Sequence, residues 1–408
     1  MKFLKHIQLN PTVSMEKGKS YPFIEMASVS TRHREPSAID NKKFSSGVKF
    51  EDEDTVIARI EPCLQNGKKF FVRNLGKGFG STEFLTFRPK DDSVDATFLY
   101  YFMQTDFIKK SMIASMTGAT GRQRVNNEIF KTMEIEVPSI EIQKRIGQVL
   151  SSYDDLIENN RKQIALLEEA AQRLYREYFV DLRFPGCEDV KVVDGVPEGW
   201  KNEPVGNVVS YNIGGGWGDD RIKDKNDQPA FVIRGTDFSG LIHGAISSIP
   251  YRYHAESNLS SRKLQDGDIV FEVSGGSKTE GVARTLLIRK ELLEMYSKPV
   301  MCASFCKLVR FEDLALAQYM YHTFQYLRSS GKTMEFDKKS ASSIVNYRWK
   351  DFLSQQNVLI PPLEILEEYN RLAESYYYQI INRSKQIETL RSARDRLLPK
   401  LMSGEIEV

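Results

Sequence analysis

The chain has 408 residues, of which 41% are hydrophobic, a net charge of +2 and four cysteines. This length predicts two or three domains, and the apolar content excludes wholesale disorder. No two cysteines form a CxxC pair, so we expect ordinary thiols in a reducing, cytoplasmic compartment rather than a zinc site or a disulfide framework. No apolar run is long enough to span a bilayer, and the first residues lack the apolar core of a signal peptide.

The charge is nearly balanced along the whole chain. Residues 1–137 hold 21 Lys and Arg against 17 Asp and Glu, whereas residues 181–357 hold 23 of each. The segments 138–180 and 358–408 each carry a net charge of −1. Any contact with nucleic acid must therefore come from local patches in the two globular regions.

The predicted elements fall into four consecutive segments. Residues 1–137 form a mixed domain with strands near 55–60, 70–72 and 83–87 and a helix over 96–112. Residues 138–182 carry a long helix that ends near residue 180. Residues 183–357 open on a linker rich in Pro and Gly and repeat the mixed pattern, with strands near 231–234, 268–273 and 304–311 and a helix over 314–328. Residues 358–408 carry a second long helix over 361–402.

The two helical segments repeat each other at a distance of 223 residues. Residues 135–179 align without a gap onto residues 358–402, and fourteen of these 45 pairs are identical. The globular segments correspond more weakly: Tyr21–Ile24 resembles Gln228–Ile233, and Asp54–Arg59 resembles Asp268–Val273. Two similar halves predict a molecule with pseudo-two-fold symmetry, which suits a two-part target.

Apolar residues in both helices follow a heptad seam with one stutter. Steps of four and three residues alternate, except for an extra step of four between Tyr153 and Ile157 that recurs between Tyr376 and Ile380. The seam positions run from Ile142 to Tyr178 and, 223 residues later, from Ile365 to Leu401. Such a stripe needs a partner, either the other helix or the helix's own globular domain. Asn160 and Arg383 are polar seam positions that either fix the register or lie at a solvated edge.

These helical segments carry a resemblance to a known family. Residues 135–179 resemble the central conserved region of the specificity subunit of type I restriction-modification enzymes, and residues 358–365 and 390–408 resemble its distal conserved region and C-terminal end. The lead-in at residues 196–209 and the segment Thr117–Val125 also match the family pattern. Leu366 replaces Gln143 of the first copy, and the cluster Gly214–Gly218 is unusual.

The resemblance implies an α+β fold, in which two mixed α/β target-recognition domains are separated by two long antiparallel coiled-coil helices. It implies a DNA-binding adaptor that reads a split, asymmetric site in double-stranded DNA, with the helices as a ruler for the unread spacer. The implied partners are two adenine-N6 methyltransferase subunits and ATP-driven restriction/translocase subunits. S-adenosylmethionine, ATP and Mg²⁺ would bind to those partners, and this chain would hold no cofactor.

Base readers need bidentate donors or acceptors, which Arg, Lys, Asn and Gln supply. In the first domain the candidates are Arg122, Gln123 and Arg124 in a Gly-flanked loop and Arg32, His33 and Arg34, with Lys68 and Lys69 for phosphates. In the second domain they are Arg234, Lys278, Lys338, Lys339 and Arg348. The alternative is that such basic loops are merely solvated. Trp217 could stack on a displaced base, although a buried core tryptophan is favoured, and Ser274–Ser277 could bring amides close to a phosphate.

No catalytic motif emerges from the sequence. There is no GxxxxGK[ST] loop, no Asn-Pro-Pro-aromatic tetrapeptide, and the five histidines lack metal-ligand spacing. We therefore expect a non-catalytic subunit. The alternatives are a self-contained nuclease, for which Asp337–Lys339 is a faint candidate, and a helical scaffold that reads no bases.

Overall fold

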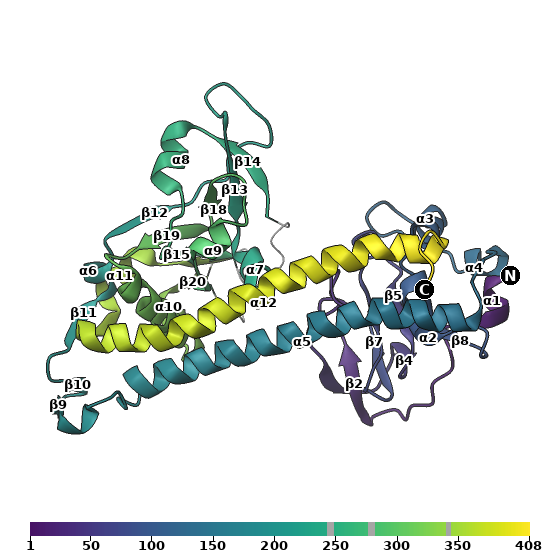
Figure 1. Ribbon diagram of the computed structural model, residues 1–408, viewed down its shortest axis with the longest axis horizontal. Coiled ribbons are helices and arrows are strands. Elements are labelled where there is room, and N and C mark those ends of the chain that lie inside the picture. Colours follow the sequence, from purple (N-terminus) through teal and green to yellow (C-terminus); the bar gives the residue numbers. More distant parts are fainter. Residues whose placement is uncertain (243–248, 276–281, 340–343) are drawn as a thin grey trace. The chain divides into compact units, whose positions relative to one another are not determined.

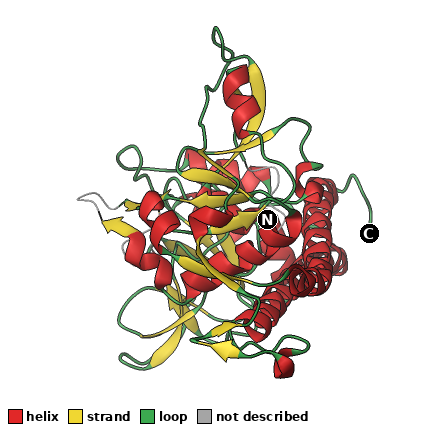
Figure 2. Cartoon of the chain, turned by 90° about the vertical axis from the view of Figure 1, so that its left-hand side faces the viewer, coloured by secondary structure: helices red, strands yellow, loops and turns green. Residues whose placement is uncertain are grey.

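The chain divides into two compact units that share both long helices (Figure 1). The computed structural model describes residues 1–242, 249–275, 282–339 and 344–408. Unit 1 comprises Met1–Asn159 and Thr389–Val408, and unit 2 comprises Asn160–Glu388. The long helices are α5 (Ile140–Phe179) and α12 (Leu363–Ser403), close to the predicted ranges. Helices and strands occur throughout, as Figure 2 shows, in agreement with the predicted α+β class.

Unit 1 joins two four-stranded sheets to short helices. Besides parts of α5 and α12, its elements are α1 (Phe3–His6), β1 (Ile7–Leu9), β2 (Ser20–Ile24), β3 (Asp40–Lys43), β4 (Val48–Phe50), β5 (Thr55–Ala58), β6 (Lys69–Phe71), β7 (Gly78–Gly80), β8 (Phe84–Pro89), α2 (Ala96–Phe102), α3 (Asp106–Ala114) and α4 (Ile129–Thr132). The strand orders are β1-β8-β5-β6 and β3-β2-β7-β4. The predicted helix over 96–112 is in fact two helices, because the chain turns between α2 and α3 at residues 103–105.

Unit 2 has the larger number of described elements. Besides parts of α5 and α12, they are η1 (Cys187–Asp189), β9 (Val192–Val193), β10 (Val196–Pro197), β11 (Lys201–Pro204), α6 (Val205–Val208), β12 (Tyr211–Gly214), β13 (Gln228–Ile233), η2 (Gly235–Asp237), α7 (Phe238–Ile242), β14 (Tyr251–His254), α8 (Glu256–Arg262), β15 (Ile269–Glu272), β16 (Ser274–Gly275), β17 (Thr285–Leu287), α9 (Lys290–Leu293), β18 (Val300–Cys302), β19 (Cys306–Arg310), α10 (Leu314–Ser329), η4 (Lys332–Phe336), β20 (Asp337–Lys339), β21 (Val345–Tyr347), α11 (Trp349–Gln355) and β22 (Asn357–Ile360). The expected linker is packed, since Phe184 and Trp200 are buried in the core.

The two four-stranded sheets of unit 1 recur in unit 2, where the second one has three described strands, β14-β13-β18. In unit 1, β5 lies between β6 and β8, and β1 adds to β8; in unit 2, β15 lies between β17 and β19, and β12 adds to β19. Likewise β2 pairs antiparallel with β3 and parallel with β7, as β13 does with β14 and β18. The duplication predicted from Tyr21–Ile24 and Asp54–Arg59 is therefore present in the fold.

A buried ion pair recurs at the same place in both units. Asp54 precedes β5 and accepts two hydrogen bonds from Arg88 of β8, at 2.6 and 2.8 Å. Asp268 precedes β15 and accepts two from Arg310 of β19, at 2.7 and 2.8 Å. Both carboxylates are fully buried and bind a backbone amide three residues earlier. A buried carboxylate is stable only with such partners, so each pair fixes the strands around the central strand.

The two long helices run antiparallel within each unit. In unit 1, Ile146 and Leu150 of α5 share a core with Leu401 of α12. In unit 2, the rings of Tyr178 and Tyr369 lie 5.7 Å apart. The same cores include side chains of the globular domains, so each helix packs against both the other helix and its domain.

Of the 22 predicted seam positions, ten are buried, ten are partly exposed and two are exposed. Seam residues from both helices are buried, namely Ile146, Ile157, Asn160, Ile164, Ala171, Tyr178, Tyr369, Ile380, Ile387 and Leu401. Ile142 and Leu372, however, are 40% and 41% exposed, so the prediction was wrong there. Arg383 is half-buried and donates to Gln386 at 3.3 Å, while the register role of Asn160 stays a prediction.

Candidate nucleic-acid interface

A short hairpin crosses the end of the central strand in each unit. In unit 1, the amide of Arg59, just after β5, donates to the carbonyl of Glu83 at 2.8 Å. In unit 2, the amide of Val273, just after β15, donates to the carbonyl of Phe305 at 2.9 Å. The shared topology and these matching bonds place Glu83 and Phe305 at equivalent positions.

The unit 1 hairpin is Thr117–Val125, the Gly-flanked loop singled out in the sequence. Thr117 and Arg124 exchange backbone hydrogen bonds of 3.0 and 2.9 Å, and Arg124 also forms an antiparallel β-bridge with Ile60. Glu61 holds the tip, because its carboxylate accepts from the amide of Gly121 at 3.0 Å. Arg122 is exposed at this tip.

Arg124 of the same hairpin has a protein partner. Its guanidinium donates to both oxygens of Glu83, at 2.7 to 3.0 Å. The hydrogen bond from Arg124 lowers the pKa of Glu83, so the carboxylate is charged at neutral pH. This pair uses Nε and Nη2 of Arg124, so hydrogens of Nη1 and Nη2 are left for other acceptors. Gln123 is half-buried, and its carbonyl accepts from the amide of Glu61 at 2.9 Å.

The unit 2 hairpin consists of β20 and β21, extended by β16. Asn346 of β21 lies between Ser274 of β16 and Lys338 of β20 in register. Neighbours across a sheet point to the same face, and both Asn346 and Lys338 are exposed. The Ser274 hydroxyl donates to the Asn346 amide oxygen at 2.9 Å. The row Ser274–Asn346–Lys338 therefore matches Ile60–Arg124–Thr117 of unit 1.

Asn346 and Phe305 were missed by the reasoning from sequence. Phe305 is 58% exposed in the turn between β18 and β19. It lies 41 residues before Asn346, and only strand pairing brings the two together.

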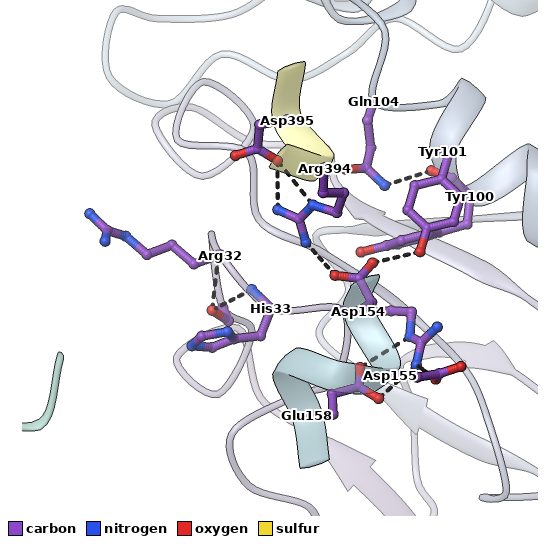
Figure 3. Close-up of polar contacts among 12 residues, drawn as sticks. Arg32, His33, Tyr100, Tyr101, Gln104, Asp154, Asp155, Glu158, Arg394 and Asp395 are labelled. Atoms are coloured by element: carbon purple, nitrogen blue, oxygen red, sulfur yellow. Dashed lines mark hydrogen bonds and ion pairs between the residues drawn. The ribbon is translucent and has the colours of Figure 1, made fainter. Parts of the chain in front are cut away.

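Arg34 does not have the surface position expected of a base reader. It is 2% exposed and donates to both oxygens of Glu158, at 3.1 and 2.6 Å, and to Asp155 at 2.6 Å. Its charge is thus neutralised by helix α5, and Arg34 anchors the loop after β2. We withdraw it as a candidate. Arg32 of the same loop is half-exposed, and Figure 3 shows its side chain directed away from Asp155 and Glu158.

The same part of α5 is tied to α2 and α12. The Tyr101 hydroxyl of α2 donates to Asp154 at 2.6 Å, and Arg394 of α12 forms an ion pair with the same carboxylate (Figure 3). Asp154 is 1% exposed, so both partners are needed to offset its desolvation. This network, with the Arg34 pairs, fixes the first domain on its portion of the long helices.

Lys68 and Lys69 are less suited to phosphate contact than the sequence suggested. The Lys68 ammonium donates to the carbonyl of Met26 at 2.6 Å. Burial, followed by the nearby charge of Arg394, lowers the pKa of Lys69 to about 8. Both side chains are half-buried, so neither is a free surface cation.

The remaining candidates of unit 2 differ in their surroundings. Arg234 donates to Asp237 at 2.7 and 2.9 Å, and Arg348 donates to Asp351 at 3.2 Å and to the carbonyl of Glu335. Both are partly exposed. Lys278 lies outside the described residues. The backbone of Lys339 belongs to β20, opposite Val345.

Trp217 is not the buried core residue that the sequence favoured. It is 38% exposed, and the guanidinium of Arg252 lies 4.4 Å from its ring centroid. Close packing of the backbone explains the glycine at position 215, because a Cβ there would lie 2.2 Å from the carbonyl oxygen of Cys302. Cys302 and Cys306 are buried free thiols, as expected.

Comparison with known proteins gives a consistent assignment. Residues 9–169 match the family model described as the type I restriction modification DNA specificity domain. The chain is 28% identical over 326 residues to the type I restriction enzyme MjaIX specificity subunit of Methanocaldococcus jannaschii, covering 78% of this chain and 71% of the relative. Over most of its length, this chain is similar to the type I restriction enzyme specificity subunits.

Further relatives and a solved structure give the same similarity. The MjaVIII specificity subunit of the same organism is 24% identical over 379 residues, covering 89% of this chain and 83% of the relative. The crystal structure of the S subunit of a type I restriction-modification system from M. genitalium shares the fold, with a TM-score of 0.53 at 14% identity over 98% of this chain and 95% of that one.

Two further features of the described residues bear on other classes of function. Among the described residues, no three His, Cys, Asp or Glu side chains are grouped so that they could hold a metal ion. In the same parts of the chain, no helix combines the length and the apolar character needed to cross a membrane.

Proposed function

We propose that this chain is the sequence-specific DNA-binding subunit of a type I restriction-modification complex, and that each unit reads half of a bipartite, asymmetric site in double-stranded DNA. The observation that carries the proposal is the hairpin that recurs at the end of β5 and β15. One fold presents Arg122 and Arg124 in unit 1 and Asn346 and Lys338 in unit 2. Equal scaffolds with different side chains suit two half-sites of different sequence.

The long helices would set the unread spacer. Two readers on one face of B-DNA reach the major groove about one turn apart, roughly 34 Å. The 40 residues of α5 span on the order of 60 Å, which is ample for this spacing. We propose that the apolar contacts between the helices within each unit make the pair stiff. The pseudo-two-fold arrangement predicted from the repeat would then present the half-sites in a fixed relation.

The chain would direct enzymes rather than act as one. We propose that two adenine-N6 methyltransferase subunits and the restriction/translocase subunits assemble with it, and that these partners bind S-adenosylmethionine, ATP and Mg²⁺. Because the DNA that it binds is chromosomal, the chain would act in the cytoplasm. The domain boundaries proposed from sequence are 1–137, 138–182, 183–357 and 358–408. The first and third segments would bind DNA, and the second and fourth would form the spacer helices on which the partners dock.

The test is to express the chain with its cognate methyltransferase in a methylation-free host and to map N6-methyladenine across the genome. A single split motif with a fixed gap would support the proposal. A stable complex that leaves the genome unmethylated would contradict the proposal that this chain recognises a DNA sequence. Metal-dependent cleavage of DNA by the purified chain alone would instead favour a nuclease.

A further inference from the structure

The equivalent hairpin positions of the two units carry opposite chemistry. In unit 1, Arg124 and Glu83 form a guanidinium–carboxylate pair, and Arg122 is exposed beside it. In unit 2, the same two positions hold Asn346 and Phe305, an amide and an exposed aromatic ring. The first set offers charged bidentate donors, whereas the second offers a neutral donor–acceptor pair and an apolar surface.

The amide of Asn346 is partly oriented by the protein. The Ser274 hydroxyl donates to its oxygen at 2.9 Å, which identifies that atom as the acceptor end of the side chain. A carbonyl oxygen has two lone pairs, so Oδ1 can accept a second hydrogen bond while Nδ2 still donates. This combination matches the N6 amino group and the N7 atom of adenine in the major groove.

Phe305 supplies the complementary apolar contact. The bond from the amide of Val273 fixes its backbone, and the amide of Ser274 also donates to its carbonyl, at 3.2 Å. An aromatic side chain that is 58% exposed to water, on a residue whose carbonyl accepts from the amides of Val273 and Ser274, is poised for an apolar partner. The methyl group of thymine is the apolar feature of the major groove.

We infer that Asn346 and Phe305 are specificity-determining residues of unit 2 and that they read an A·T base pair, with Ser274 as the positioning residue. The inference rests on the proposed function and adds which base pair this site takes. Lys338, the other neighbour of Asn346, then faces the DNA backbone. The corresponding site of unit 1, with Arg122 at its tip, is suited to guanine.

The test measures which bases the complex selects. Asn346→Ala, Phe305→Ala and Asn346→Arg are each expressed with the methyltransferase, and the methylated motif is mapped. Binding to duplexes with single base-pair changes is then measured for the same complexes. Phe107→Ala is the matched control, because Phe107 is a similarly exposed phenylalanine (53%) on α3 of unit 1.

We expect Asn346→Ala and Phe305→Ala to lower the preference for one A·T position by about tenfold or more, in one half of the motif only. Asn346→Arg should shift that position toward G·C, which a merely structural residue would not do. If Asn346→Ala is poorly folded, Asn346→Asp replaces it, since a carboxylate cannot donate to N7.

An unchanged motif, or equal loss at every base pair, would overturn the assignment. Failure of the proposed function is distinguishable, because the wild-type complex would then give no split motif at all. A wild-type split motif that these variants leave intact would refute only the roles of Asn346 and Phe305.

Discussion

Arg32 and Arg34 show how two neighbouring arginines take different roles. Arg34 is buried between Asp155 and Glu158, whereas the side chain of Arg32 is directed away from them. Removing one partner of a buried ion pair leaves the other charge uncompensated, at a cost of about 3–5 kcal/mol. Arg34→Met should therefore lower the free energy of unfolding by about that amount in urea denaturation. Arg32→Met, the control, should change it by about 0.5 kcal/mol or less; equal effects would contradict the anchoring role.

Among the residues that the structure describes, Arg122 forms no ion pair, and we expect it to act on DNA. We expect Arg122→Ala to weaken recognition of the half-site of unit 1 about tenfold or more, while the other half of the motif is unchanged. Competition binding with duplexes altered in either half would measure this. Equal loss on unrelated DNA would instead identify Arg122 as a phosphate contact.

Glu168 makes the stability of unit 2 depend on pH. It lies on α5 beside Tyr321, Tyr377 and His322, where burial raises the pKa of its carboxyl to about 7. A raised pKa means that the folded state holds the proton more tightly, so stability is present at low pH and is lost as the pH rises from about 4.5 to 7. Burial lowers the pKa of His322 to about 4, so His322 stays neutral over that window.

Glu168→Gln should remove this dependence. Because Glu168 is only partly shielded from water, we expect a gain of about 1–2 kcal/mol at pH 7.5 and little change at pH 5. Thermal unfolding of the full chain at both pH values would measure it. Glu169→Gln, an exposed neighbour on the same helix, is the control. A gain that is the same at both pH values would argue against titration of Glu168.

At the scale of elements, we expect the length of the helix pair to set the length of the unread DNA spacer. Seven residues inserted between Asn159 and Asn160, and seven between Glu388 and Thr389, fall at the boundaries of the units and preserve the heptad seam. The insertion adds about 10 Å, or roughly three base pairs of spacer. Both half-sites should stay the same in the methylation map. Altered half-sites with an unchanged gap would contradict the proposal that helix length sets the spacer.

At the scale of the whole molecule, the duplicated topology predicts that one domain can serve twice. A chimera in which residues 1–137 replace residues 183–357 before α12 should recognise the half-site of unit 1 in both positions, as an inverted repeat. The reason is that α5 and α12 are antiparallel within each unit and offer repeated seams. A methylation map shows the outcome directly. A motif that keeps the half-site of unit 2 would contradict the equivalence of the two domains.

The sequence by itself determined the elements that local periodicity encodes. The apolar seam and the repeat at 223 residues predicted α5 and α12 within a few residues, and the paired aspartates Asp54 and Asp268 marked the matching strands. Such patterns depend on residues near each other in the chain, where spacing alone defines which side faces the core.

Only the tertiary structure decided whether each charged or aromatic side chain is buried or exposed. Arg34 and Arg32 are alike in sequence, yet Glu158, 124 residues away, takes Arg34 into the interior. Asn346 pairs with Ser274, whose amide donates to the carbonyl of Phe305, and Trp217 is exposed despite its apolar character. Whether a polar group faces solvent depends on partners brought in from distant segments, and no local pattern carries that information.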